Sequence, residues 1–187
     1  MFTLRAPSDA SLAAFVAAQR DVPFSYPEVA ASRGEPPPGY RVDRRCELVG
    51  RGEAAFDRAR HAVQHWEMHV AAGVRVVPQA EVRPDLTVAL VVRAAGLCTT
   101  SACRVVYRID EAHRAGFAYG TLRDHPVAGE ERFVVERGAN DEVTLELRAF
   151  SRPSSLLFRL AGPVTRGMQA SIGGAYIEAL RRIVARS

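Results

Sequence analysis

Residues 143–151 read VTLELRAFS, and this stretch decides the fold class. Hydrophobic side chains at 143, 145, 147 and 149 alternate with the polar side chains Thr144, Glu146 and Arg148. An alternation of period two is typical of a β-strand with one buried face and one wetted face. Since strands of a parallel sheet are buried on both faces, the stretch predicts an antiparallel sheet.

Other segments supply partners for this strand. The pattern of hydrophobic residues predicts six strands, at 74–78, 86–94, 103–110, 115–122, 130–137 and 143–151, and one more at 40–50. Within 103–110 the alternation recurs, so Val105, Tyr107 and Ile109 are expected to share a face. The turn sequence GAND at 138–141 joins the last two strands as a hairpin.

Two helices flank these strands. The first is predicted over 53–70, after the strand-to-helix turn at Gly50 and Gly52, because its hydrophobic residues form one stripe. The second is predicted over 163–184. Its Gly173-Gly174 pair costs about 1 kcal/mol per glycine relative to Ala, which indicates a kink or a close approach by another group.

The first 38 residues are expected to form an arm packed on one main domain, residues 39–187. A short helix is predicted over 9–20, where Leu12, Phe15 and Val16 share a face. The proline-rich stretch GEPPPGY at 34–40 then serves as a stiff connector. Phe24 and Tyr26 should dock with the helix on the main domain.

Composition suits a globular domain. The chain has 187 residues, of which 48% are hydrophobic and 25% are charged. No apolar run approaches the roughly 20 residues of a membrane span, and the N-terminus lacks the pattern of a signal peptide. The three cysteines, Cys46, Cys98 and Cys103, form no CxxC pair, so a reduced, cytoplasmic protein without a metal or other cofactor is expected.

The basic residues are unusual because all 25 are arginines. With 21 acidic residues the net charge is +4. Arginine suits phosphate geometry, so nucleic-acid binding is one interpretation. A coding bias toward Arg and Ala is the other, and the scattered positions of the arginines favour it.

The order strand, helix, six strands, long helix indicates an α+β protein and resembles the helix-grip fold. That is the architecture of START-related lipid-transfer domains, birch-pollen-allergen-like proteins and polyketide cyclases. The resemblance implies a curved antiparallel sheet of about six to seven strands wrapped around the long C-terminal helix, with a cavity between them.

Specific blocks resemble a bacterial and plant family, domain-of-unknown-function family nineteen-ninety. They are PFSYPEVAAS (23–32), PPPGYRVDRRCELVGRGEAAFDRA (36–59), HAVQHWEMH (61–69), CRVVYRIDE (103–111), FAYGTLRDHPVAGEERF (117–133) and AFSRPSSLLFRLAGPVTRGMQ (149–169). Two positions depart from the family pattern: His69 replaces an aromatic residue, and Ser101 stands where Asn is expected. The resemblance implies a fold and no established activity.

The 117–133 block holds the candidate catalytic residues Tyr119, His125 and Glu131. If Glu131 faces the cavity among hydrophobic side chains, its pKa is raised and it can act as an acid or base, with His125 or Tyr119 as partner. The structural alternative is that His125 caps a turn and that Glu130 or Glu131 pairs with an arginine. Arg148 and Arg152 are the candidate partners for such a pair.

The predicted ligand-binding residues are mostly aromatic or polar groups expected at the cavity: Trp66, Tyr107, Tyr119, Thr121, Glu131, Arg152, Gln169 and Tyr176. A second cluster, His61, His65 and His69, has the i, i+4 spacing that can chelate zinc on a helix. Their helical face is opposite the hydrophobic stripe, so an exposed, metal-free surface is expected.

The leading hypothesis is a cytoplasmic binding module that holds a small apolar or amphipathic molecule between the sheet and the C-terminal helix. The main alternative is an enzyme, cyclase- or hydrolase-like, that uses the same cavity for acid/base chemistry. A third is an arginine-mediated protein or RNA interaction module.

Overall fold

The computed structural model describes residues 2–94, 96–123, 125–154 and 162–186, without the side chains of 2, 94 and 162–170. The strands are β1 (Phe2–Thr3), β2 (Arg41–Arg51), β3 (Arg75–Val77), β4 (Thr87–Ala94), β5 (Leu97–Asp110), β6 (Arg114–Thr121), β7 (Val127–Arg137) and β8 (Glu142–Pro153). The helices are α1 (Asp9–Ala18), the 3-10 helix η1 (Ala31–Arg33), α2 (Glu53–Gln64), α3 (Glu67–Ala71) and α5 (Gly162–Val184).

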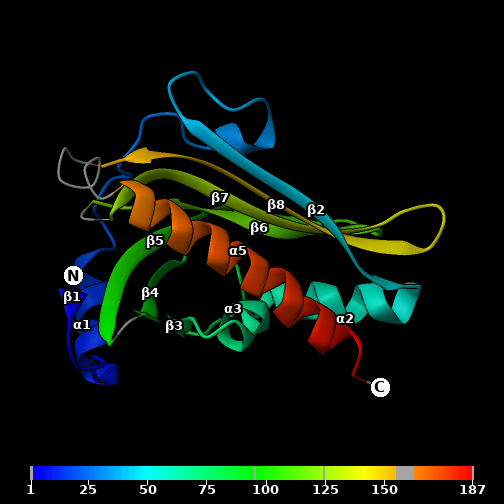
Figure 1. Cartoon of the computed structure of the whole chain (residues 1–187), viewed down its shortest axis with the longest axis horizontal. Helices are drawn as coiled ribbons and strands as arrows, with labels where there is room; N and C mark the ends of the chain where they lie inside the picture. Colours follow the sequence, from blue (N-terminus) through cyan, green and yellow to red (C-terminus); the bar gives the residue numbers. More distant parts are fainter. Residues whose placement is uncertain (1, 95, 124, 155–161, 187) are drawn as a thin grey trace.

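The strands form one antiparallel sheet in the order β2-β8-β7-β6-β5-β4-β3, and β1 pairs with β5. The sheet curves around α5, which crosses its concave face, while α1 and the segment that leads from it to β2 lie on the convex face (Figure 1). This confirms the α+β, antiparallel architecture expected from the alternation in 143–151. Gly52, at φ 82°, ends β2 and begins α2, as a strand-to-helix turn requires.

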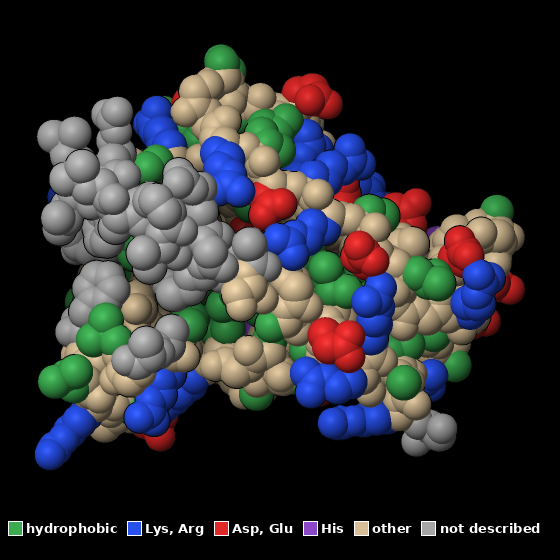
Figure 2. All heavy atoms as spheres, in the orientation of Figure 1, with side chains coloured by type: hydrophobic (Ala, Val, Ile, Leu, Met, Phe, Trp, Pro, Cys, Tyr) green, Lys and Arg blue, Asp and Glu red, His purple; other side chains and the backbone are tan. Residues whose placement is uncertain are grey.

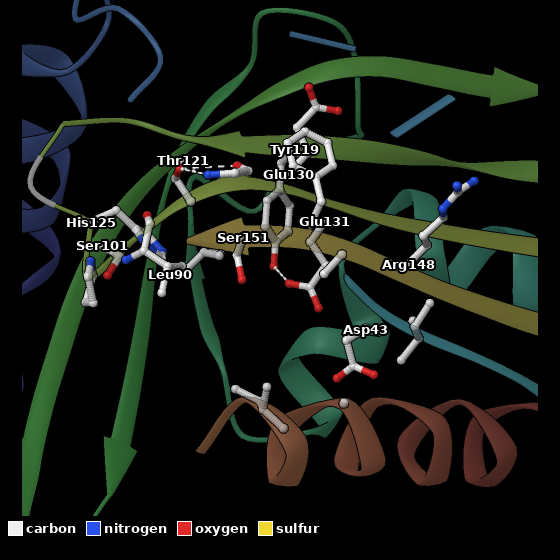
Figure 3. Close-up of a pocket in the computed structure, with 18 of the residues that line it drawn as sticks. Asp43, Leu90, Ser101, Tyr119, Thr121, His125, Glu130, Glu131, Arg148 and Ser151 are labelled. Atoms are coloured by element: carbon white, nitrogen blue, oxygen red, sulfur yellow. Dashed lines mark hydrogen bonds between the residues drawn. The ribbon is translucent and has the colours of Figure 1, made fainter. Parts of the chain in front are cut away.

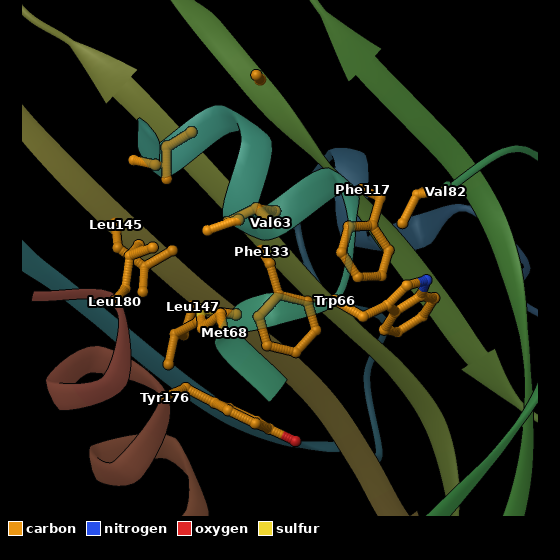
Figure 4. Packing of buried hydrophobic residues seen from close by; sticks show 14 of the residues in the cluster. Val63, Trp66, Met68, Val82, Phe117, Phe133, Leu145, Leu147, Tyr176 and Leu180 are labelled. Atoms are coloured by element: carbon orange, nitrogen blue, oxygen red, sulfur yellow. The ribbon is translucent and has the colours of Figure 1, made fainter. Parts of the chain in front are cut away.

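The main core lies between the sheet and the helices α2, α3 and α5 (Figure 4). Trp66, Phe117 and Phe133 are fully buried in it; the Phe117 ring meets Trp66 edge-on and stacks with Phe133. Tyr176 and Leu180 bring α5 onto the same cluster. This packing fixes the helix against the sheet and so sets the position of the cavity beside it.

The helix expected over 53–70 is wrong in one respect, because it breaks after α2. Trp66 adopts a left-handed conformation with φ 63°, and α3 begins in a new direction. The i, i+4 relation between His65 and His69 is therefore lost. His61 stays exposed and His65 is half-buried, and their rings stack, whereas His69 is fully buried in the aromatic core.

The expectation that Val105 and Tyr107 share a face is also wrong. A β-bulge between them shifts the register of β5 against β6. Val105 packs in the main core, but the Tyr107 hydroxyl lies 2.7 Å from the Ser32 hydroxyl of the arm. The guanidinium of Arg33 lies 4.0 Å above the Tyr107 ring. Tyr107 therefore helps to hold the arm on the convex face.

Hydrophobic side chains from the first 38 residues contact the sheet. Leu12 and Val16 of α1 contact Ala89 and Val91 of β4. Gly120 makes room for the segment that follows α1, because a Cβ at Gly120 would lie 2.0 Å from the Tyr26 hydroxyl. A backbone bridge between residues 24 and 122 continues the contact.

Within the described ranges, no helix is long and apolar enough to cross a membrane. The three cysteines are free thiols, with Cys98 and Cys103 buried and Cys46 exposed. On the face drawn in Figure 2, arginine side chains are interspersed with Asp and Glu and do not form one basic surface.

Candidate functional site

A cavity of about 180 Å³ lies between the concave face of the sheet and α5 (Figure 3). Its lining is mostly apolar and includes Val74, Leu90, Val92, Leu147 and Ile172. Four serine and threonine residues also line it: Thr99, Ser101, Thr121 and Ser151. Six charged residues contribute to the lining as well: Arg41, Asp43 and Arg45 of β2, Glu130 and Glu131 of β7, and Arg148 of β8.

Glu131 forms a hydrogen-bonded pair with Tyr119 from the neighbouring strand. The register places the two residues opposite each other, and the Tyr119 hydroxyl donates to Glu131 Oε2 at 2.7 Å. Burial and the nearby Asp43 raise the pKa of the Glu131 carboxyl, although Tyr119 and Arg45 act in the opposite direction. Among the described residues, no arginine lies within ion-pair distance of this carboxylate. The expected partner Arg148 instead lies 4.0 Å from Glu35 of the arm.

Arg45 reaches the same end of the cavity because α5 leaves space for it. A Cβ built on Gly173 would lie 3.4 Å from Arg45 Cζ, and one on Gly174 would lie 3.8 Å from Nη1. The helix is continuous over this glycine pair, and a Cβ there would be in ordinary van der Waals contact with Arg45. The Arg45 guanidinium is 3.6 Å from the Asp43 carboxylate.

His125 lies at the other end of the cavity, beside Ser101 (Figure 3). Its Nδ1 accepts a hydrogen bond from the backbone N–H of Val127 at 3.2 Å, in a tight local turn. Burial lowers the pKa of His125 to about 4. In the close-up His125 and Glu131 are well separated, so they do not form an acid/base pair.

The neighbouring carboxylate, Glu130, is not among the predicted site residues, yet it is only 2% exposed. It points to the opposite face of the sheet from Glu131 (Figure 3). There it accepts hydrogen bonds from the Tyr26 hydroxyl at 2.9 Å, from the Ser32 hydroxyl at 2.6 Å and from the backbone N–H of Ala30. Glu130 therefore anchors the arm, and strand alternation alone explains why Glu131 faces the cavity.

The predicted ligand-binding residues separate into groups. Four of them line the cavity: Tyr119, Thr121, Glu131 and Tyr176. Trp66 is buried in the core and donates its indole N–H to the carbonyl of Ala80 at 3.0 Å. Tyr107 and Arg152 lie on the convex side, where Arg152 stacks over Tyr40 at 4.6 Å. The side chain of Gln169 lies outside the described residues.

The histidine cluster does not form a metal site. His69 is buried away from His61 and His65, and in the described part of the chain no three His, Cys, Asp or Glu side chains are grouped to hold a metal. Both ring nitrogens of His69 are buried without a hydrogen-bond partner, and burial lowers its pKa to about 3.

Structures with the same arrangement are known, although their sequences are only distantly similar. A hypothetical protein of Helicobacter pylori aligns with 78% of this chain and 89% of its own, with a TM-score of 0.56 and 12% identity. Ara h 8.0201 aligns with 78% of this chain and 98% of its own, with a TM-score of 0.51 and 12% identity. Truncated norcoclaurine synthase from Thalictrum flavum aligns with 79% of this chain and 95% of its own, with a TM-score of 0.51 and 10% identity. These likenesses show the helix-grip fold.

Sequence relatives are closer. A UPF0548 protein of Deinococcus radiodurans is 39% identical over 181 residues, which cover 90% of this chain and 91% of the relative. A UPF0548 protein of Dictyostelium discoideum is 30% identical over 192 residues, covering 90% and 89%. The family model described as a domain of unknown function, DUF1990, matches residues 25–179. The chain therefore belongs to the DUF1990 family.

Proposed function

We propose that this protein binds a small, mostly apolar molecule in the cavity between the sheet and α5. The observation that carries the proposal is the lining: an apolar wall that includes Leu90, Val92 and Ile172, with a few polar groups converging at its ends. Ligand sites in proteins commonly have this composition, in which apolar area supplies affinity and a few polar atoms fix the orientation.

The size of the cavity restricts the ligand. A volume of about 180 Å³ equals that of roughly six water molecules, so the ligand is a small molecule or part of a larger one. Helix-grip neighbours, among them an enzyme named norcoclaurine synthase, support a ligand site at this place in the fold. The three free thiols support a reducing, cytoplasmic location, which we include in the proposal.

Calorimetric titration with octanol tests the proposal directly. Ala149 lies between Glu131 and Asp43 in the sheet register and lines the cavity. The Ala149→Leu variant should lose octanol binding because the added side chain fills the space. Ala13→Leu makes the same change at an exposed site on α1 and should bind as the wild type does. Equal binding by both variants would reject the cavity as the site.

Acid/base catalysis in the same cavity is a second candidate, favoured by the state of Glu131. An arginine pair would mark this carboxylate as a structural lock, whereas its only described hydrogen-bond partner is Tyr119. Its raised pKa brings it closer to the range in which a carboxyl can both donate and accept a proton near neutrality. The Tyr119 hydroxyl fixes one oxygen and leaves the other available to a substrate.

This candidate is tested by comparing Glu131→Gln with the wild type in two measurements. Octanol affinity and thermal stability should change little, because glutamine keeps the shape of the side chain and leaves no arginine unpaired. Turnover of a library of esters and cyclisable ketones should be present in the wild type and absent in the variant. Equal turnover by the two proteins would exclude Glu131 as a catalytic acid or base.

A further inference from the structure

One end of the cavity holds a guanidinium that the sequence accommodates at a cost. Arg45 lies on the concave face of β2, and its guanidinium approaches α5 at Gly173 and Gly174. Two glycines in the middle of a helix destabilise it by about 1 kcal/mol each relative to alanine. A Cβ at either position would lie in ordinary van der Waals contact with the guanidinium, so the glycine pair leaves the surroundings of this cation open.

The hydrogen-bonding capacity of Arg45 is largely unused. Its described ion pair is a single contact to Asp43 at 3.6 Å, longer than the 2.7–2.9 Å typical of a charge-assisted hydrogen bond. Arg41, two residues earlier on the same face, has no carboxylate within 4.0 Å among the described side chains. The guanidinium donors at this end therefore exceed the acceptors that pair with them.

The acceptors at this end are already engaged. Glu131 Oε2 accepts from Tyr119, and the Asp43 carboxylate faces Arg45. Burial raises the pKa of the Glu131 carboxyl, which disfavours its negative charge. Among the described side chains, Arg41 is left without a carboxylate partner.

We propose, building on the proposed function, that the cavity ligand carries a carboxylate, which Arg45 binds, and an apolar body that extends toward Leu90 and Val92. A carboxylate matches the planar fork of a guanidinium and can be held by two parallel N–H···O bonds. Arg45 comes from β2 at one edge of the sheet and Leu90 from β4 near the other. Figure 3 shows Asp43 and Glu131 well separated from Leu90, so head and tail positions are distinct.

Matched probes separate this inference from the proposed function. Octanoate, octanol and octylamine share one chain and differ in the head group, and their dissociation constants are measured by calorimetry at constant pH and ionic strength. We expect octanoate to bind about tenfold or more tightly than octanol, because a hydrogen bond to a charged group is worth more than a neutral one. Octylamine should bind the most weakly.

Variants of β2 locate the effect. Arg45→Gln should lower the affinity for octanoate by about tenfold, to the level of octanol, and should leave the affinity for octanol unchanged. Arg44→Gln is the matched control, since Arg44 points to the convex face and pairs with Glu146 at 2.9 Å. It should leave all three constants unchanged.

A second variant keeps the test valid if Arg45→Gln does not fold. Arg45→Lys retains the positive charge but lacks the planar fork that makes two parallel N–H···O bonds to a carboxylate. It should weaken octanoate selectively. Tighter binding of octylamine, equal binding of octanoate and octanol, or no effect of either variant on octanoate would overturn the carboxylate assignment while the proposed function stands. If none of the three probes binds, both the carboxylate assignment and the proposed function are wrong.

Discussion

His69 offers a quantitative test of the buried aromatic core. Its ring is fully buried, 4.6 Å from the ring of Tyr176 and 4.8 Å from that of Phe133. Neither ring nitrogen has a hydrogen-bond partner, and its pKa falls from 6.5 to about 3 because burial disfavours the cation. In the unfolded chain the same group titrates near 6.5.

The sign and size of the effect follow from this shift. Between pH 6.5 and pH 3 the unfolded chain binds a proton that the folded chain does not, so stability falls as pH decreases. At pH 5 the difference for His69 amounts to about 2 kcal/mol relative to pH 8. His125, with a pKa lowered to about 4, adds a similar loss.

His69→Phe should remove about half of this acid destabilisation while keeping an aromatic ring in place. Urea unfolding is measured at pH 8 and pH 5 for the wild type, His69→Phe and the half-buried control His65→Phe. The predicted result is a smaller difference between the two pH values for His69→Phe than for His65→Phe, by about 2 kcal/mol. If the two variants show the same difference, His69 is hydrated or hydrogen-bonded and the burial argument fails.

Four other outcomes follow from the same contacts. Glu131→Gln should keep or raise the melting temperature at pH 7, because the raised pKa of Glu131 means that its charged form destabilises the fold; a loss of about 3 kcal/mol would indicate a hidden ion pair. Glu130→Ala should cost more than about 2 kcal/mol, since it leaves the buried Tyr26 and Ser32 hydroxyls without their acceptor, and an unchanged urea midpoint would contradict this. Deleting residues 1–38 should lower the melting temperature, and a full melting temperature would show that the arm is a tail. Binding to single-stranded RNA, measured by fluorescence anisotropy, should vanish by about physiological salt, whereas salt-resistant, sequence-selective binding would revive the interaction hypothesis.

The sheet and the final helix could be predicted because their signals are periodic. The alternation in 143–151 fixes the faces of β8, and hydrophobic residues such as Ile172, Tyr176 and Leu180 mark the face of α5 toward the core. Gly120 and the Gly173-Gly174 pair were also informative, because each marks a place where another group approaches the backbone. These signals are local, so a single sequence carries them.

The remaining features depend on tertiary context. Trp66 has no sequence mark of a helix break, since a left-handed conformation is usually signalled by Gly or Asn. The β-bulge after Val105 also has no signal in the sequence, and it moves Tyr107 to the convex face. Glu130 and Glu131 are adjacent, so composition alone could not tell which one anchors the arm and which one faces the cavity.

The location of a bound ligand tests the central claim most directly. A crystal of the protein soaked with ω-bromo-octanoate would reveal the bromine by anomalous scattering, independently of any activity. We predict one anomalous peak between the sheet and α5, near Leu90 and Val92, with the carboxylate at Arg45. A peak on the convex face, or a cavity without bromine at saturating concentration, would contradict the account.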